Sequence, residues 1–179
     1  MMLRSLIVST SFALMALSAQ ASPEAEALIA GTATQISNAE ASESTIKQAV
    51  DIDAIANFTL GKYSRRVSDT DKTRFKSAFE KFLVGTFQDQ KNKLKNATVE
   101  VIGSVDRNDK DSVVETRVTQ EGEDPQTVRW RVIERNGEWR VVDVEVLGLW
   151  LAIEQRAQIA AILDKPRATI DDAIAALDS

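Results

Sequence analysis

The sequence has 179 residues and a formal net charge of −5, with 22 Lys and Arg residues against 27 Asp and Glu residues. It contains neither Cys nor His, which excludes disulfide bonds, thiolate metal sites and the Ser-His or Cys-His pairs that most hydrolases use. The acidic balance argues against a nucleic-acid partner and against electrostatic adhesion to anionic lipid surfaces.

The first residues have the layout of a cleavable secretory signal peptide. An apolar run from Leu6 to Leu17 follows a single charge, Arg4, and a small-residue cleavage pattern ends at Ala21. The run is shorter than the roughly 20 residues that span a bilayer. We therefore predict a signal peptide over 1–21 and one soluble domain over 22–179.

Helices are expected next along the chain. Sparse apolar positions over 23–49 indicate one or two amphipathic helices joined near Ser42. A short helix is expected from Asp51 to Leu60, and Gly61 is placed to end it in a left-handed conformation.

An aromatic helix follows. Ser68 and Asp71 form a capping pair at the start of a helix that runs toward Gln90. Gly85 within it marks a kink or a close approach by another element. The large apolar positions recur at helical spacing and share one stripe: Phe75, Phe79, Phe82, Leu83 and Phe87. Such a stripe is either an ordinary core wall or the wall of a binding site.

After Lys95 the apolar period changes to two, which predicts β-strands. Four strands are expected: Thr98 to Val105, Val113 to Gln120, Gln126 to Arg135 and Glu138 to Leu147. The dipeptide Asn136-Gly137 is the strongest hairpin signal in the chain.

Two-residue closure at Asn136-Gly137 pairs residue 135 with residue 138 and fixes the register of this hairpin. The register predicts Asp143 opposite Trp130 and Glu145 opposite Val128, with Val144 and Val146 on the other face. Neither face is then purely apolar. Either both faces are partly covered, which favours a cavity between layers, or the sheet carries scattered surface valines.

Two helices end the chain. One is expected over Leu149 to Leu163, stopped by Pro166, and another over Thr169 to Leu177, with Thr169 as its cap. Together the elements predict an α+β fold in which N-terminal and C-terminal helices wrap a four-stranded twisted antiparallel sheet and enclose an apolar cavity.

A mechanism built on carboxylates alone is the remaining catalytic alternative. Three carboxylate pairs are available: Asp51 and Asp53, Asp109 and Asp111, and Asp171 and Asp172. Each pair also has a structural explanation: the first and third pairs lie at expected helix starts, where negative charge is favourable, and the second lies in a polar turn. We therefore expect no enzyme activity, no metal and no cofactor.

Several short motifs occur in a fixed order along the mature chain. They are Leu60-Gly61-Lys62-Tyr63, Arg74-Phe75, Ala78-Phe79 ahead of Leu83, Gly137-Glu138-Trp139-Arg140-Val141-Val142-Asp143-Val144, Gly148, and Gln155-Arg156 with Gln158. In this order and spacing, behind a signal peptide, the chain resembles the MlaC (toluene-tolerance) family of periplasmic phospholipid shuttles.

The resemblance implies a lipid carrier in the periplasm. It implies that phospholipid passes between an outer-membrane lipoprotein complex and an inner-membrane ABC transporter, which maintains outer-membrane lipid asymmetry. Trp150 stands where the family usually has a small Ser, and this bulk leaves a hopanoid or another polycyclic lipid as an alternative cargo. The alternative of another class is a periplasmic interaction or chaperone-like protein whose apolar stripe is only core.

A carrier pocket needs apolar walls and few hydrogen bonds, and the predicted lipid-binding residues are apolar. They are Ile55, Phe79, Phe82, Leu83, Trp130, Val132, Val144, Val146, Trp150 and Ile153. At the pocket mouth we expect Arg156 to contact a phosphate headgroup, with Tyr63 nearby in the family pattern. A structural salt bridge is the alternative role of Arg156.

Overall fold

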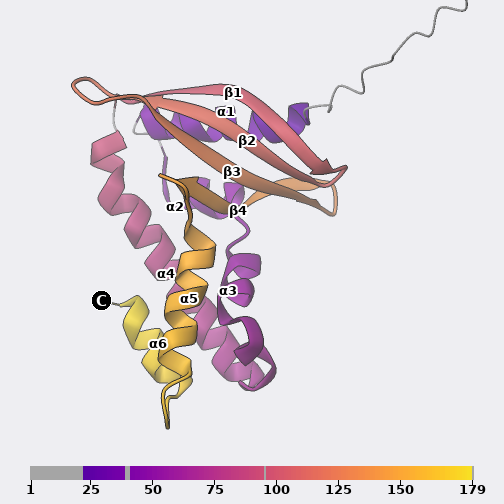
Figure 1. The fold of residues 1–179 in the computed structure, drawn as a ribbon, viewed down its shortest axis with the longest axis vertical. Helices are drawn as coiled ribbons and strands as arrows, with labels where there is room; N and C mark the ends of the chain where they lie inside the picture. Colours follow the sequence, from indigo (N-terminus) through magenta and orange to yellow (C-terminus); the bar gives the residue numbers. More distant parts are fainter. Residues whose placement is uncertain (1–21, 39–40, 95, 179) are drawn as a thin grey trace, which may run out of the picture.

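The computed structural model describes residues 22–38, 41–94 and 96–178, and the predicted signal peptide lies outside them. Figure 1 shows a twisted sheet above a stem of helices. α1 (Pro23–Ser37) runs along the sheet. The stem contains α3 (Ile52–Leu60), α4 (Asp69–Leu94), α5 (Leu151–Leu163) and α6 (Ile170–Leu177). The predicted α+β fold is confirmed.

The N-terminal helices begin and end where their capping residues predict. α2 (Glu43–Ala49) starts after Ser42, which forms a capping box with Thr45. The carboxylate of Asp51 accepts a hydrogen bond from the Ala54 amide at 2.9 Å and so caps α3. Gly61 ends α3 with φ of 52°, a conformation that favours glycine, and the 3-10 turn η1 (Gly61–Arg65) follows. The predicted junction near Ser42 and the predicted end at Gly61 are therefore confirmed.

The aromatic helix α4 is longer than predicted. At its start the Ser68 hydroxyl accepts a hydrogen bond from the Asp71 amide at 3.1 Å and donates one to the Asp71 carboxylate at 2.8 Å. This confirms the predicted capping pair. The helix continues beyond Gln90 to Leu94, and Figure 1 shows it rising from the lower stem toward one end of the sheet.

The described residues form one antiparallel sheet with its strands in chain order. Its strands are β1 (Thr98–Asn108), β2 (Asp111–Thr119), β3 (Gln126–Arg135), β4 (Glu138–Val146) and β5 (Leu149–Trp150). The prediction of four strands is wrong because Leu147 and Gly148, with φ of 52° and 82°, turn the chain back on β4. Leu149 and Trp150 then pair with β4, so α5 begins two residues later than predicted.

The predicted turn at Asn136-Gly137 is confirmed, with φ of 55° and 82° at its two residues. The predicted register beyond it is wrong because Val142 is an extra, bulged residue between Val141, which pairs with Val132, and Asp143. Past the bulge every residue of β4 changes face. The observed pairs are Trp130 with Val144, Val128 with Val146, Arg131 with Asp143 and Arg129 with Glu145.

Two hydrophobic clusters hold the fold. The helical cluster joins the stem helices around a set of fully buried side chains that includes Leu60, Phe75 and Ile159. The sheet cluster joins α1 to the strands through Ala25, Ile29, Val114, Val132 and Val141. Val50 packs against both clusters, which makes it an apolar link between the stem and the sheet.

Candidate functional site

The side of the sheet that faces the helices, called the inner face below, is apolar. The bulge at Val142 places Val144 and Val146 on this face beside Trp130 and Val128. α1 covers the part near Val114, Val132 and Val141. Trp130, Val144 and Val146 are only half-buried. The inner face therefore has a covered half and a partly open half.

The polar groups of the open half bind one another. The indole nitrogen of Trp130 donates to the Thr116 hydroxyl at 2.9 Å. That hydroxyl donates in turn to the carbonyl oxygen of Val128 at 3.1 Å. Since these groups are already satisfied, this part of the inner face offers a ligand apolar contact rather than hydrogen bonds.

The stripe of α4 changes in burial along the helix. Phe75 and Phe79 are buried in the helical cluster, with their ring centroids 6.1 Å apart. Phe79 also packs against Phe82, with centroids 5.9 Å apart. Phe82, Leu83 and Phe87 are only half-buried. The first turns of the stripe are therefore core, whereas the later turns keep apolar surface available.

The connection from β4 to α5 exposes an unusual amount of apolar surface. Leu147, Leu149, Leu151 and Ile153 are 77%, 55%, 50% and 50% exposed. Leu149 pairs with Val146 and so lies on the inner-face side of β5. Trp150 pairs with Glu145 and lies on the opposite, outer side.

The structure divides the ten predicted lipid-binding residues among three environments. Ile55, Phe79, Phe82 and Leu83 belong to, or pack against, the helical cluster. Trp130, Val132 and Val144 belong to, or pack against, the sheet cluster. Val146, Trp150 and Ile153 lie in neither cluster. Ile55, Phe79 and Val132 are buried as core side chains in this structure. Contact of these residues with lipid stays a prediction.

Trp150 lies on the outer face of the sheet, in a shallow depression of ≈ 670 Å³. The floor of this depression includes Val105 and Val113. Ion pairs border it: Arg129 binds Glu115 at 3.3 Å and Glu145 at 3.0 Å. The bulk of Trp150 is therefore directed away from the open half of the inner face.

Arg156 packs on α3 and η1. Its guanidinium lies 4.8 Å from the ring centroid of Phe58, a cation–π contact. A Cβ atom built on Gly61 would come within 2.9 Å of the Arg156 Nε atom. Arg156 thus fills the space that Gly61 leaves open, at the contact between α3 and α5. The predicted contact of Arg156 with a headgroup stays a prediction.

Tyr63 is buried, and its hydroxyl donates to the carboxylate of Asp164 at the end of α5. Lys62 binds the same carboxylate at 2.9 Å. The hydrogen bond from Tyr63, and then the one from Lys62, lower the pKa of Asp164 below its ordinary value. Tyr63 thereby joins η1 to the end of α5, and its predicted place at a pocket mouth stays a prediction.

Asp143 fixes the start of α5 on the outer edge of the open half. Its carboxylate accepts hydrogen bonds from the amides of Ala152 and Val144, each at 2.8 Å. Burial raises the pKa of Asp143 above its ordinary value, whereas the two amides act in the opposite direction. Asp143 is part of the Gly137–Val144 motif, but its capping role was not predicted because the bulge that orients it has no turn residue to signal it.

Three residues that were absent from the predicted site also lie on the inner side: Thr116, Val128 and Leu149. Val128 follows from strand alternation, because it lies on the same face of β3 as Trp130 and Val132. Leu149 gave no such signal, because its place depends on the turn at Leu147-Gly148 that pairs it with Val146.

The predicted enclosed cavity between sheet and helices stays a prediction. Three hollows of the described part of the chain lie elsewhere: one near the α5–α6 connection, one between Tyr63 and Thr169, and the outer-face depression. The described residues bring no three His, Cys, Asp or Glu side chains together in a group suited to a metal ion. No helix among them has the length and apolar composition needed to cross a membrane.

Comparison with known proteins gives a family and a fold. The family model described as MlaC protein matches residues 28–179. The structure is similar to that of a phospholipid-binding protein from Ralstonia solanacearum, solved in complex with a phospholipid. The two are 20% identical, with a TM-score of 0.70 over 86% of this chain and 92% of that chain. No curated protein matches the sequence.

Proposed function

This chain belongs to the MlaC family, and from that membership we propose that it is a periplasmic carrier of phospholipid with no catalytic chemistry. The acyl chains lie between Phe82 and Leu83 of α4 and the open half of the inner face, against Trp130, Val144 and Val146. The observation that carries the proposal is the burial of these side chains, since all five are apolar and only half-buried.

Half-buried apolar walls suit a cargo that must enter and leave. A two-tailed lipid exposed to water uncovers about 30 methylenes at about 0.8 kcal/mol each, or roughly 24 kcal/mol in gross terms. A carrier has to offset most of this cost and yet release the lipid, so its site should be about as apolar as a bilayer. The satisfied Trp130–Thr116 pair meets that condition, because it leaves no polar group for an acyl chain to bury unpaired.

The family also indicates the route. We propose that residues 1–21 are a signal peptide, that 22–179 form the mature domain, and that this domain moves phospholipid between an outer-membrane lipoprotein complex and an inner-membrane ABC transporter. Such transfer maintains the lipid asymmetry of the outer membrane. The phospholipid held by the Ralstonia protein of similar fold supports phospholipid over a polycyclic cargo.

The first test is native mass spectrometry of the mature protein purified without detergent, followed by extraction and identification of any bound lipid. We expect a bound mass of phospholipid size in near-stoichiometric amount. A protein that stays lipid-free under gentle conditions, while it unfolds cooperatively, would contradict the carrier proposal.

A pair of valine variants locates the site. Val146→Asp places a carboxylate at the open half of the inner face, whereas Val105→Asp places one on the outer face, where Val105 is 62% exposed. We expect Val146→Asp to lower bound lipid severalfold and Val105→Asp to leave it unchanged. Thermal unfolding of both variants checks that each is folded, and equal lipid loss in the two would contradict the proposed location.

A further inference from the structure

The segment from Leu147 to Ile153 forms an apolar tip on an otherwise charged molecule. Leu147, Leu149, Leu151 and Ile153 are each at least half exposed. Single exposed leucines are common, but four exposed large apolar side chains within seven residues concentrate apolar surface at one end of β4, as interaction sites do. The tip lies where β4 turns into β5 and α5, beside the open half of the inner face.

The tip is held in place rather than left to move as a loop. β5 pairs with β4, and the Asp143 carboxylate binds the Ala152 amide at 2.8 Å. Leu147, the most exposed of the four, adopts φ of 52° in a two-residue turn. Asn or Gly ordinarily occupies such a position, because a larger side chain is strained there. Local folding therefore does not favour Leu147, which points to selection for its exposed side chain.

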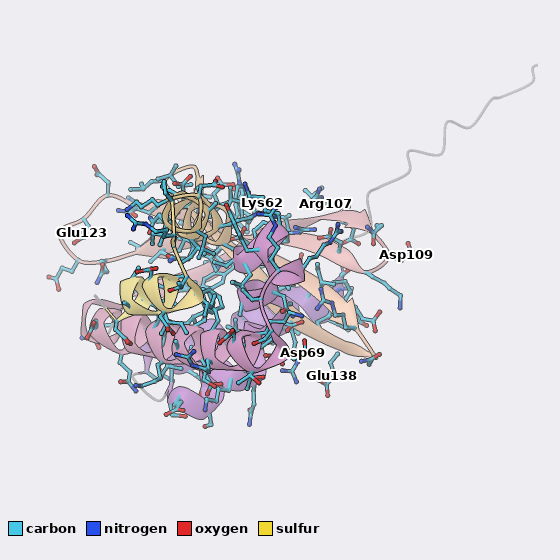
Figure 2. The ribbon with its side chains drawn as sticks, turned by 90° about the horizontal axis from the view of Figure 1, so that it is seen from below. Lys62, Asp69, Arg107, Asp109, Glu123 and Glu138 are labelled. Atoms are coloured by element: carbon cyan, nitrogen blue, oxygen red, sulfur yellow. The ribbon has the colours of Figure 1, made fainter. Side chains whose placement is uncertain are left out.

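Exposed carboxylates lie at the same end of the molecule as this tip. The loop between β2 and β3 carries Glu121, Glu123 and Asp124, and it lies at the same end of the sheet because Val128, just beyond it, pairs with Val146. Figure 2 shows Glu123 at this end and Arg107 and Asp109 at the opposite end. Glu154 directly follows the tip and is exposed. The ion pairs found among the described residues involve none of these four carboxylates. The neighbouring Arg156 is turned onto Phe58.

Resting on the carrier function above, we propose that Leu147, Leu149 and Leu151 dock into an apolar cleft of a partner protein whose rim carries Lys or Arg side chains. An anionic bilayer is disfavoured as the occupant because it would repel these four carboxylates. A second copy of this chain would bring the same carboxylates together. A basic rim around an apolar cleft complements both features and places the open half of the inner face against the partner.

The test uses a photo-crosslinking amino acid, benzoylphenylalanine, placed at Leu151 of the full chain in its native host. Val105, exposed on the outer face, is the control position. We expect an adduct with one distinct protein from position 151 and none with that protein from position 105. Leu147→Asn keeps a turn-compatible residue but removes the apolar side chain, and it should lower the adduct yield at least threefold. Glu123→Lys with Glu154→Lys should lower it by a similar factor.

Other results overturn the proposal. An adduct yield that is unaffected by the charge reversal excludes the basic rim. An adduct of twice the chain mass identifies a second copy as the occupant. Leu147-dependent binding to vesicles with phosphatidylglycerol identifies a membrane as the occupant. Bound lipid is measured separately by extraction. If wild type lacks lipid but crosslinks as expected, the carrier function fails and the docking surface stands. If Leu147→Asn loses lipid and keeps its adduct, the tip belongs to the lipid site instead.

Discussion

Asp143 connects sheet and stem through a single carboxylate. The position that precedes α5 is occupied by Trp150, which supplies no side-chain cap, so Asp143 caps this helix from β4. A helix start without a cap leaves amide groups unpaired, and replacing a capping residue by Ala typically costs about 1 kcal/mol. The orientation of α5 beside the open half of the inner face therefore depends on this residue.

We expect Asp143→Ala to lower the free energy of unfolding by about 1–2 kcal/mol, and Asp143→Asn to lower it less, because the Asn oxygen still accepts from Ala152. Burial raises the pKa of Asp143 in the folded protein, so the folded state binds its proton more tightly than the unfolded chain does. Its contribution to stability is then complete below the unfolded-state pKa of about 3.9 and declines as the pH rises through the folded-state pKa.

Urea unfolding of wild type and Asp143→Asn at several pH values measures this dependence. The stability of wild type relative to the Asn variant should fall as the pH rises above about 4, because only wild type carries a titrating carboxyl group at position 143. A difference that rises with pH would show that the two amide hydrogen bonds outweigh burial.

Two glycines respond oppositely to the same substitution. Gly61→Ala adds a Cβ at φ of 52° and 2.9 Å from the Nε of Arg156, and we expect a loss of about 1–3 kcal/mol. Gly85→Ala, inside α4, meets no atom within 4 Å and should gain about 1 kcal/mol. Thermal unfolding of both variants tests this pair, and a destabilised Gly85→Ala would reveal the close approach that the sequence suggested at Gly85.

At the scale of elements, capping and turn residues in the sequence predicted the helix starts and the hairpin turn correctly. Ser68, Asp51 and Thr169 each cap the helix that the sequence assigned to them, and Asn136-Gly137 forms its hairpin. Each of these signals acts through a hydrogen bond or backbone conformation within a few residues. The chemistry of the residues themselves was therefore sufficient for these features.

The register of β4 depended on more than local signals. Val142 has no special backbone preference that would signal a bulge. The bulge separates apolar from charged side chains: the valines after it face the helices, and Asp143 and Glu145 lie beside Arg131 and Arg129. Predicting it requires a comparison of the two possible registers across both strands and both layers. The same limit affected the site: Leu149 rather than Trp150 lies on the inner side, because Leu147-Gly148 forms a turn without a typical turn residue at its first position.

Deleting Val142 tests the role of the bulge. Without this residue Asp143 follows Val141 directly and pairs with Arg131 in a regular ladder, so Asp143 and Glu145 keep their places on the outer face. We therefore expect the deletion variant to keep one cooperative unfolding transition and its bound lipid. Deletion of Gly122 from the exposed β2–β3 loop is the control and should retain the transition as well. Loss of the transition in the Val142 deletion alone would show that the fold needs the local twist of the bulge and not only the register that it sets.

At the scale of the whole molecule, the sheet and the stem are separate hydrophobic clusters with few links. Val50 packs against both, the Asp51 amide donates to the Val141 carbonyl at 2.9 Å, and Arg135 binds the Asp51 carboxylate at 2.8 Å. A lipid between α4 and the inner face would add apolar contacts to both clusters. The proposed cargo therefore acts as a further structural link between the two parts.

Removing the lipid should weaken this link. A ligand that binds only the folded state at 100 times its Kd stabilises it by about 2.7 kcal/mol. For a domain of this size that corresponds to a fall in Tm of roughly 5–10 °C on delipidation. Hydrogen exchange should also accelerate in β3, β4 and the second half of α4, and remain unchanged in the β1–β2 turn on the far end of the sheet. Acceleration confined to the α5–α6 connection would place the lipid in the stem, away from the inner face.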